Sequence, residues 1–170
     1  MSAPVVIFAV GNPSRGDDAI GPELCARLDA WLRDEKLADR FALIEDFQLQ
    51  IEHALDLSGR QLALFIDAGA GTPAPYVFRP IVPAEGIAHT THALPPEAVL
   101  QVYRQTEAAA IPPAFVLCVR GESFELGEAL SRPAESNLQA AFALLTRLCR
   151  QSTLADWQGM ARRQPAFCLT

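Results

Sequence analysis

The chain has 170 residues, half of them apolar, a size that favours one domain with a sizeable core. Its 14 Lys and Arg residues against 20 Asp and Glu residues give a net charge of -6, and the basic residues do not cluster, so we expect no nucleic-acid partner. The sequence shows neither a membrane span nor the basic region and cleavage site of a signal peptide, so we expect a cytoplasmic protein that does not bind a membrane.

The first predicted element is a strand over residues 5–10, which are apolar without interruption. Such a run is typical of a strand that is buried on both faces of a parallel sheet. A turn rich in glycine and proline follows, and the adjacent Asp17 and Asp18 then open a helical pattern that extends to about Arg33. We therefore expect both carboxylates at the carboxyl end of a central strand, where open α/β sheets bind their ligands.

Two more strands are predicted in the first half of the chain, over residues 41–44 and 62–66, with a short helix over 51–57 between them. The third strand repeats the feature of the first, because it is continuously apolar and ends in a carboxylate, Asp67, followed by a glycine-rich turn. A doubly wound sheet with the strand order 2-1-3 would place the first and third strands side by side. Asp18 and Asp67 would then face each other across the crevice between them.

The second half of the chain predicts an antiparallel strand, because the connection to residues 76–79 is too short for a crossover helix. The remaining pattern indicates a polar loop over residues 83–96 that carries His89 and His92. It also indicates a helix over 95–106, a strand over 114–119 and a final helix over 133–151.

The predicted fold class is α/β, a three-layer sandwich with a mostly parallel twisted sheet of about five strands, one of them antiparallel, and helices on both faces. We expect a single domain over residues 1–170, with a core over 5–150 and an irregular C-terminal extension over 151–170.

Three side chains are candidates for a shared site: Asp18, Asp67 and His92. Each also has an ordinary structural explanation, since acids at a helix start complement the helix dipole, Asp-Ala-Gly is common turn chemistry, and a loop histidine can bond to its own loop. Two carboxylates and one imidazole form an incomplete coordination sphere that suits a divalent ion such as nickel or zinc. The open positions can hold an activated water, polarise a carbonyl or accept ligands from a partner.

Other catalytic motifs are missing from the sequence. The turn Gly11-Asn-Pro-Ser-Arg-Gly16 matches neither G-x-G-x-x-G nor a lysine-containing phosphate loop, and no G-x-S-x-G nucleophile elbow occurs. The four cysteines are scattered without a C-x-x-C pair, which argues against a zinc knuckle and a disulfide framework. Cys118 lies inside a predicted buried strand, so we do not expect it to be a nucleophile.

Four segments carry a recognisable combination of motifs: Val10-Gly-Asn-Pro-Ser-Arg-Gly-Asp-Asp-Ala-Ile-Gly-Pro22, Phe65-Ile-Asp-Ala-Gly69, Thr91-His-Ala-Leu94, and Val116-Leu-Cys-Val-Arg-Gly-Glu-Ser123 with Leu130-Ser131. Together they resemble the [NiFe]-hydrogenase maturation proteases, endopeptidases that remove a short C-terminal peptide from the precursor of the hydrogenase large subunit. The resemblance covers roughly residues 5–150.

The resemblance implies that Asp18, Asp67 and His92 are the metal-ligating and catalytic residues, and that they dock nickel supplied by the precursor. Other divalent ions such as zinc or cadmium can occupy such a site. Asp18 stands where many members have Glu, and His89 fits the histidine position less well than His92. Many members carry an Asp-Gly-Gly-Thr-like stretch that is associated with substrate recognition, whereas this chain reads Asp46-Phe-Gln-Leu-Gln50.

The function implied by the resemblance is that of a hydrolase with the large-subunit precursor as its partner, which we expect to be a monomer. Asp17 and Arg15 are expected to support the site or to contact the peptide. Two alternatives stay open. The first is a nickel-checking or chaperone-like binding module with the same site but no cleavage. The second is a flavodoxin-like domain that binds a small molecule and is indifferent to Asp67→Ala.

Overall fold

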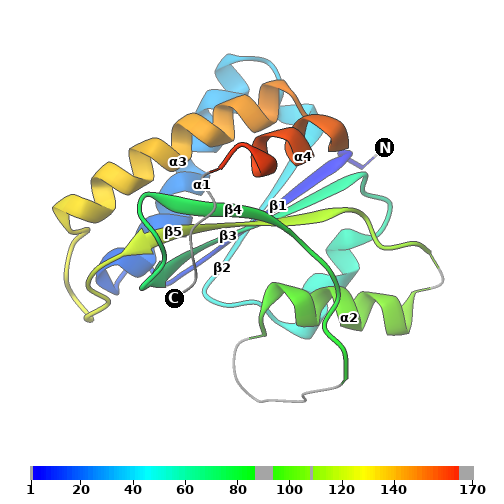
Figure 1. The fold of residues 1–170 in the computed structure, drawn as a ribbon, viewed down its shortest axis with the longest axis horizontal. Coiled ribbons are helices and arrows are strands. Elements are labelled where there is room, and N and C mark those ends of the chain that lie inside the picture. The colour runs from blue at the N-terminus through cyan, green and yellow to red at the C-terminus, as the bar shows by residue number, and fades with distance from the viewer. Residues whose placement is uncertain (1, 87–93, 108, 165–170) are drawn as a thin grey trace.

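A five-stranded sheet forms the centre of the computed structural model, which describes residues 2–86, 94–107 and 109–164 (Figure 1). The strand order is β2-β1-β3-β5-β4, so the predicted 2-1-3 arrangement of the first three strands is confirmed. All neighbouring strands run parallel except the β4–β5 pair, which is antiparallel as predicted. The strands are β1 (Val5–Val10), β2 (Phe41–Asp46), β3 (Leu62–Ala70), β4 (Tyr76–Ile81) and β5 (Ala114–Gly121).

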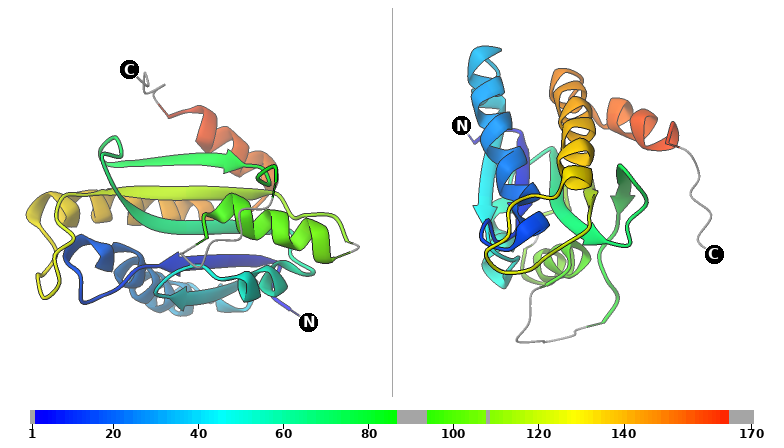
Figure 2. Two further views of the ribbon diagram at one scale, coloured as in Figure 1. Left: turned by 90° about the horizontal axis from the view of Figure 1, so that it is seen from below. Right: turned by 90° about the vertical axis from the view of Figure 1, so that its left-hand side faces the viewer.

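Helices cover both faces of the sheet and complete the predicted three-layer sandwich (Figures 1 and 2). One core cluster lies between the sheet and three α-helices, and a second lies between the sheet and the opposite pair of helices. Across the described ranges, no helix is both long and apolar enough to cross a membrane. On the first face are α1 (Ile20–Asp34), α3 (Arg132–Arg150) and α4 (Leu154–Arg162), and on the second are α2 (Pro96–Thr106) and the 3-10 helix η3 (Ile51–Leu57).

The central strands owe their position to continuous apolar runs. All six residues of β1 are buried, as are the first five of β3, because helices cover both faces of the sheet there. The pairing of β3 with β5 continues through Asp67 to Ala70, so β3 is longer than the predicted strand 62–66. Asp67 therefore lies within the sheet rather than in a turn after it.

The sequence predicts an irregular extension over residues 151–170, and this prediction is wrong for the described part. Helix α4 begins after Thr153, whose hydroxyl accepts a hydrogen bond from the Asp156 amide. Trp157 is fully buried, packs edge-on against Phe115 with ring centroids 5.4 Å apart, and donates from Nε1 to the Leu148 carbonyl over 3.0 Å. Only Trp157 and Met160 of this helix are buried, which explains why its sequence shows weak periodicity.

Replacing Trp157 with alanine is expected to lower the free energy of unfolding by about 3–5 kcal/mol, because the change leaves a large cavity beside β4 and β5. Urea denaturation measures the effect. Leu154→Ala is the matched control on the same helix, since Leu154 is 37% exposed and should cost less than about 1 kcal/mol. Equal losses in the two variants would show that α4 does not contribute to the core.

Candidate functional site

A row of side chains crosses the sheet at the carboxyl ends of the parallel strands. Val10 is paired with Asp46 in β2, Asp67 comes one residue after the last β1–β3 pair, and Asp67 is paired with Cys118 in β5. Val10 and Phe65, which lies two residues before Asp67, both belong to the core cluster beneath α2. Because side chains alternate along a strand, Asp67 lies on the same face of the sheet as Val10. The row therefore brings two carboxylates and a thiol to one edge, on the α2 side.

Asp18 reaches this edge from the turn that follows β1. It lies in the 3-10 helix η1 (Gly16–Ala19), and one of its carboxylate oxygens, Oδ2, accepts a hydrogen bond from the Asn12 amide over 2.7 Å. A Cβ on Gly11, whose φ is +150°, would lie only 2.0 Å from the Asp18 carbonyl oxygen. Glycine at this position thus allows the backbone of Asp18 to pack directly against the end of β1.

Asp67 carries a carboxylate whose charged form is disfavoured. Although the residue keeps access to solvent, the surrounding protein atoms desolvate it, and the nearby negative charge of Asp18 adds to the effect. Together these outweigh the hydrogen bond from the Ala68 amide to Oδ1 and raise the pKa of Asp67 to about 6. The negative charges of Asp18 and Asp67 repel each other, and a cation bound by both would relieve this repulsion.

The raised pKa of Asp67 predicts how the stability of the folded chain changes with pH. The pKa of Asp67 is higher in the folded chain than the value of about 3.9 in an unfolded one, so its contribution to stability is fully present below pH 4 and is lost as the pH rises through about 6. Asp67→Asn should therefore be more stable than the natural chain at pH 7, by up to about 1 kcal/mol after solvent screening, and equally stable at pH 4. Urea denaturation at the two pH values measures this, and a difference that does not change with pH would contradict it.

Asp17 is a structural residue, although the sequence alone does not distinguish it from the adjacent Asp18. Its side chain is 0% exposed and accepts hydrogen bonds from the amides of Glu122, Ser123 and Ser131 and from the Ser131 hydroxyl, over 2.6–3.0 Å. Burial by itself raises the pKa of Asp17, but these hydrogen bonds outweigh it and hold the pKa below its usual value. Asp17 therefore fastens the loop after β5 and the start of α3 to the turn that carries Asp18.

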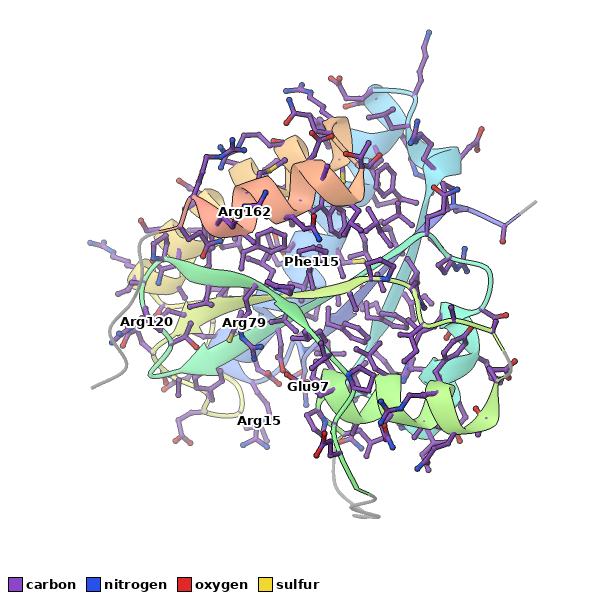
Figure 3. The ribbon with its side chains drawn as sticks, turned by 45° about the vertical axis from the view of Figure 1, so that its right-hand side comes forward. Arg15, Arg79, Glu97, Phe115, Arg120 and Arg162 are labelled. Carbon is purple, nitrogen blue, oxygen red and sulfur yellow. The ribbon has the colours of Figure 1, made fainter. Side chains whose placement is uncertain are left out.

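Arg15 lies at the surface beside the same loop (Figure 3). Its Nε donates to the carbonyl of Phe124 over 3.4 Å, so the guanidinium group helps to hold the loop after β5 in place. Arg15 remains exposed to solvent.

Cys118 is half-buried next to Asp67 rather than fully buried as predicted. Its sulfur lies 3.1 Å from the hydroxyl of Thr72, and a Cβ on Gly69 would come within 2.7 Å of it. Burial, more than any other factor, raises the pKa of the Cys118 thiol. A neutral thiol is a weak nucleophile, and the expectation that Cys118 is not a nucleophile stays a prediction.

One pair near the site was missed by the sequence reasoning. His53 in η3 is 7% exposed, and its Nε2 lies 3.4 Å from Oδ2 of Asp46 at the end of β2. The Gln50 amide donates to Nδ1 of His53 over 2.8 Å, so the proton of the neutral ring is on Nε2, facing the carboxylate. Asp46 follows the apolar run of β2 with one residue, Glu45, between them, and this acidic strand end could have drawn attention to it. Nothing in the sequence pointed to His53.

The predicted histidine ligand, His92, lies outside the described residues, as does His89. The helix that follows them, α2, is tied to the sheet by an ion pair between Arg79 and Glu97, with Nη2 and Oε1 3.4 Å apart (Figure 3). Within residues 2–86, 94–107 and 109–164, no group of three or more His, Cys, Asp or Glu side chains is arranged to hold a metal ion. The described part of the chain thus supplies two of the three predicted ligands, Asp18 and Asp67.

Several solved structures with a similar fold are hydrogenase maturation proteases by name. The hydrogenase maturating endopeptidase HybD from Escherichia coli is 22% identical with a TM-score of 0.67, and the match covers 87% of this chain and 93% of that one. The [NiFe] hydrogenase maturation protease HycI from Thermococcus kodakarensis is 21% identical with a TM-score of 0.64, covering 88% and 93%. This chain has the fold of the [NiFe] hydrogenase maturation proteases.

The maturation-protease fold is recognisable here by structure and not by overall sequence. No protein-family model matches the chain, and no curated protein does. A third structure, a hydrogenase 2 maturation peptidase from a Thaumarchaeota archaeon, is only 19% identical, yet it has a TM-score of 0.56 over 83% of this chain and 94% of that one. Buried apolar patterns can keep a fold while most residues change, because the core requires suitable shape and hydrophobicity rather than particular side chains.

Proposed function

We propose that this chain is an endopeptidase that removes a short C-terminal peptide from the nickel-loaded precursor of a [NiFe]-hydrogenase large subunit. The observation that carries the proposal is the placement of Asp67 in β3, level with the end of β1, beside the turn that holds Asp18, in a chain with the maturation-protease fold. The motifs around these two acids and around His92 support the same function. We further propose that the protein works as a cytoplasmic monomer.

In this proposal, the precursor brings the nickel ion, and Asp18, Asp67 and His92 bind it through its open coordination positions. Two carboxylates and one imidazole suit a borderline divalent ion and leave room for the ligands that the precursor retains. Binding the ion at a fixed point would orient one peptide bond of the precursor at the site. Orientation of this kind can lower a reaction barrier by about 7–11 kcal/mol.

The test is to incubate the purified chain with the nickel-loaded precursor and to measure the mass of the large subunit. The proposal expects a shortened large subunit and a released C-terminal peptide. A nickel-checking or chaperone-like module would bind the precursor through the same three residues and leave its mass unchanged. Precursor without nickel is the matched control, because it lacks the ion that docks at the site.

His92→Ala is expected to reduce processing by at least about 100-fold, because removing a metal ligand costs more than the 10–100-fold that loss of a supporting contact costs. His89→Ala is the matched control and should process the precursor at the rate of the natural chain. The rate of appearance of the shortened subunit in gel or mass measurements separates the two variants. A loss in the His89 variant alone would assign the ligand to His89 instead.

A further inference from the structure

The outer edge of β2 is open for pairing with another strand. Among the described strands, β2 borders the sheet and has β1 as its single neighbour (Figure 2). The carbonyl of Asp46 accepts from the Gly11 amide, so the backbone groups of Asp46, and of every second residue before it, point toward β1. The backbone groups of Leu43 and Glu45 therefore point outward, and within the described part of the chain no hydrogen bond reaches them.

The opposite edge of the sheet is closed. On β4, the outward amide of Phe78 donates to Oε1 of Gln164 over 2.9 Å, and Pro80, the next outward position, has no amide hydrogen. Helix α4 also packs beside this strand. Proteins commonly block exposed strand edges with proline, side-chain bonds or covering helices, because an open edge pairs with other chains. β4 carries all three devices, whereas the outward groups of β2 carry none in the described residues.

The open edge leads into the candidate site. Asp46, the last residue of β2, is bonded to Gly11 at the end of β1, and the next amide along, that of Asn12, donates to the carboxylate of Asp18. The segment that follows β2 carries three large apolar side chains that are more than half exposed: Phe47 (66%), directly after the strand, and Ile51 (55%) and Leu55 (67%) in η3. A peptide paired with β2 would thus meet apolar side chains at the same end at which it meets the acidic site.

We propose that the C-terminal segment of the precursor binds as an added strand along the outer edge of β2. This inference rests on the proposed function, and it names the surface that holds the substrate. A polypeptide segment in extended form supplies the alternating N–H and C=O groups that Leu43 and Glu45 lack, which is the usual mode of strand addition. The backbone pairing would direct the segment past Asp46 toward Asp18 and Asp67, and Phe47, Ile51 and Leu55 would favour apolar side chains in the segment.

Amide hydrogen exchange of the natural chain, resolved residue by residue, tests the pairing with and without the nickel-loaded precursor. We expect the amides of Leu43 and Glu45 to exchange at least about tenfold more slowly when the precursor is bound. The amides of Ala42 and Ile44 already bond to β1, so they serve as internal controls and should change little. Protection that appears without precursor and grows with protein concentration would overturn the proposal, because it would assign the edge to a second copy of this chain.

The exchange measurement separates this inference from the proposed function. Processing of the precursor without protection of Leu43 and Glu45 overturns the edge pairing and leaves the proposed function intact. Protection without processing keeps the pairing and removes the endopeptidase activity. If neither appears, both proposals fail.

A pair of variants at one position gives an independent test. Leu43→Pro removes an outward amide, keeps the extended backbone and shortens a side chain that packs against the core, whereas Leu43→Val keeps the amide and also shortens that side chain. The proline variant should raise KM about tenfold with kcat unchanged, as expected for loss of about one hydrogen bond, and the valine variant should leave both constants within about twofold. Thermal unfolding of both variants checks the fold. A folded proline variant with an unchanged KM would overturn the proposal.

Discussion

Asp67→Asn is expected to lower the rate of precursor processing by at least about 100-fold while the chain stays folded. Asparagine keeps the shape of the side chain and the acceptor for the Ala68 amide, but it removes the negative charge that would bind the nickel ion. The same change relieves the repulsion from Asp18. Activity and stability at pH 7 should therefore move in opposite directions, a combination that general damage to the fold cannot produce.

Two further variants complete this test. Asp18→Asn should lose processing to a similar degree, since it removes the other charge of the pair. Asp39→Asn, on the exposed 3-10 helix η2 (Ala38–Arg40), should process the precursor at the natural rate. The rates come from the mass of the large subunit over time. Near-normal processing by Asp67→Asn would remove the metal-docking role from this residue.

Asp17→Ala is expected to lower the free energy of unfolding by at least about 3 kcal/mol. The change leaves three backbone amides and the Ser131 hydroxyl without their buried acceptor, and hydrogen bonds to a charged group are worth about 1.5–3 kcal/mol each. It also frees the loop after β5 and the start of α3 from the turn that holds Asp18. Urea denaturation at pH 7 measures the loss.

Asp18→Ala is the matched control for Asp17→Ala, because the two residues are adjacent and carry the same charge. Asp18 is half-buried and accepts a single hydrogen bond, from Asn12, so its removal should cost about 1 kcal/mol. The contribution of Asp17 requires its charged form. Since its pKa is below the unfolded value, that contribution should be present above pH 4 and lost as the pH falls below it. Equal stability of the two alanine variants would show that Asp17 does not fasten the loop.

The fold followed closely from the sequence where local patterns are strong. Uninterrupted apolar runs located β1, β3 and β5, and the short connection before Tyr76 correctly predicted the antiparallel strand. The prediction was weakest at α4, where the hydrophobic pattern has only two buried residues, and at the end of β3, where pairing with β5 extends the strand through polar and small residues. In both cases, contacts with distant parts of the chain decide the structure.

Part of the candidate site was also accessible from the sequence. A carboxylate after a buried strand is a local signal, and it identified Asp67 at the end of the buried part of β3 and Asp18 in the turn after β1. It gave no means of telling Asp17 from Asp18, because the partners of Asp17 lie more than 100 residues away, from Glu122 to Ser131. The position of His92 stays a prediction, since it lies outside the described residues.

By itself, the sequence determined the layered α/β architecture, the order of the central strands and the two acids at their ends, because hydrophobic periodicity and turn residues act over short distances. Only the tertiary structure decided that buried Asp17 accepts hydrogen bonds from the loop after β5 and that His53 faces Asp46. It also decided that, among the described residues, the outer edge of β2 is unpaired while that of β4 is covered. These features depend on which groups come into contact after the chain has folded, and local sequence patterns do not predict such contacts.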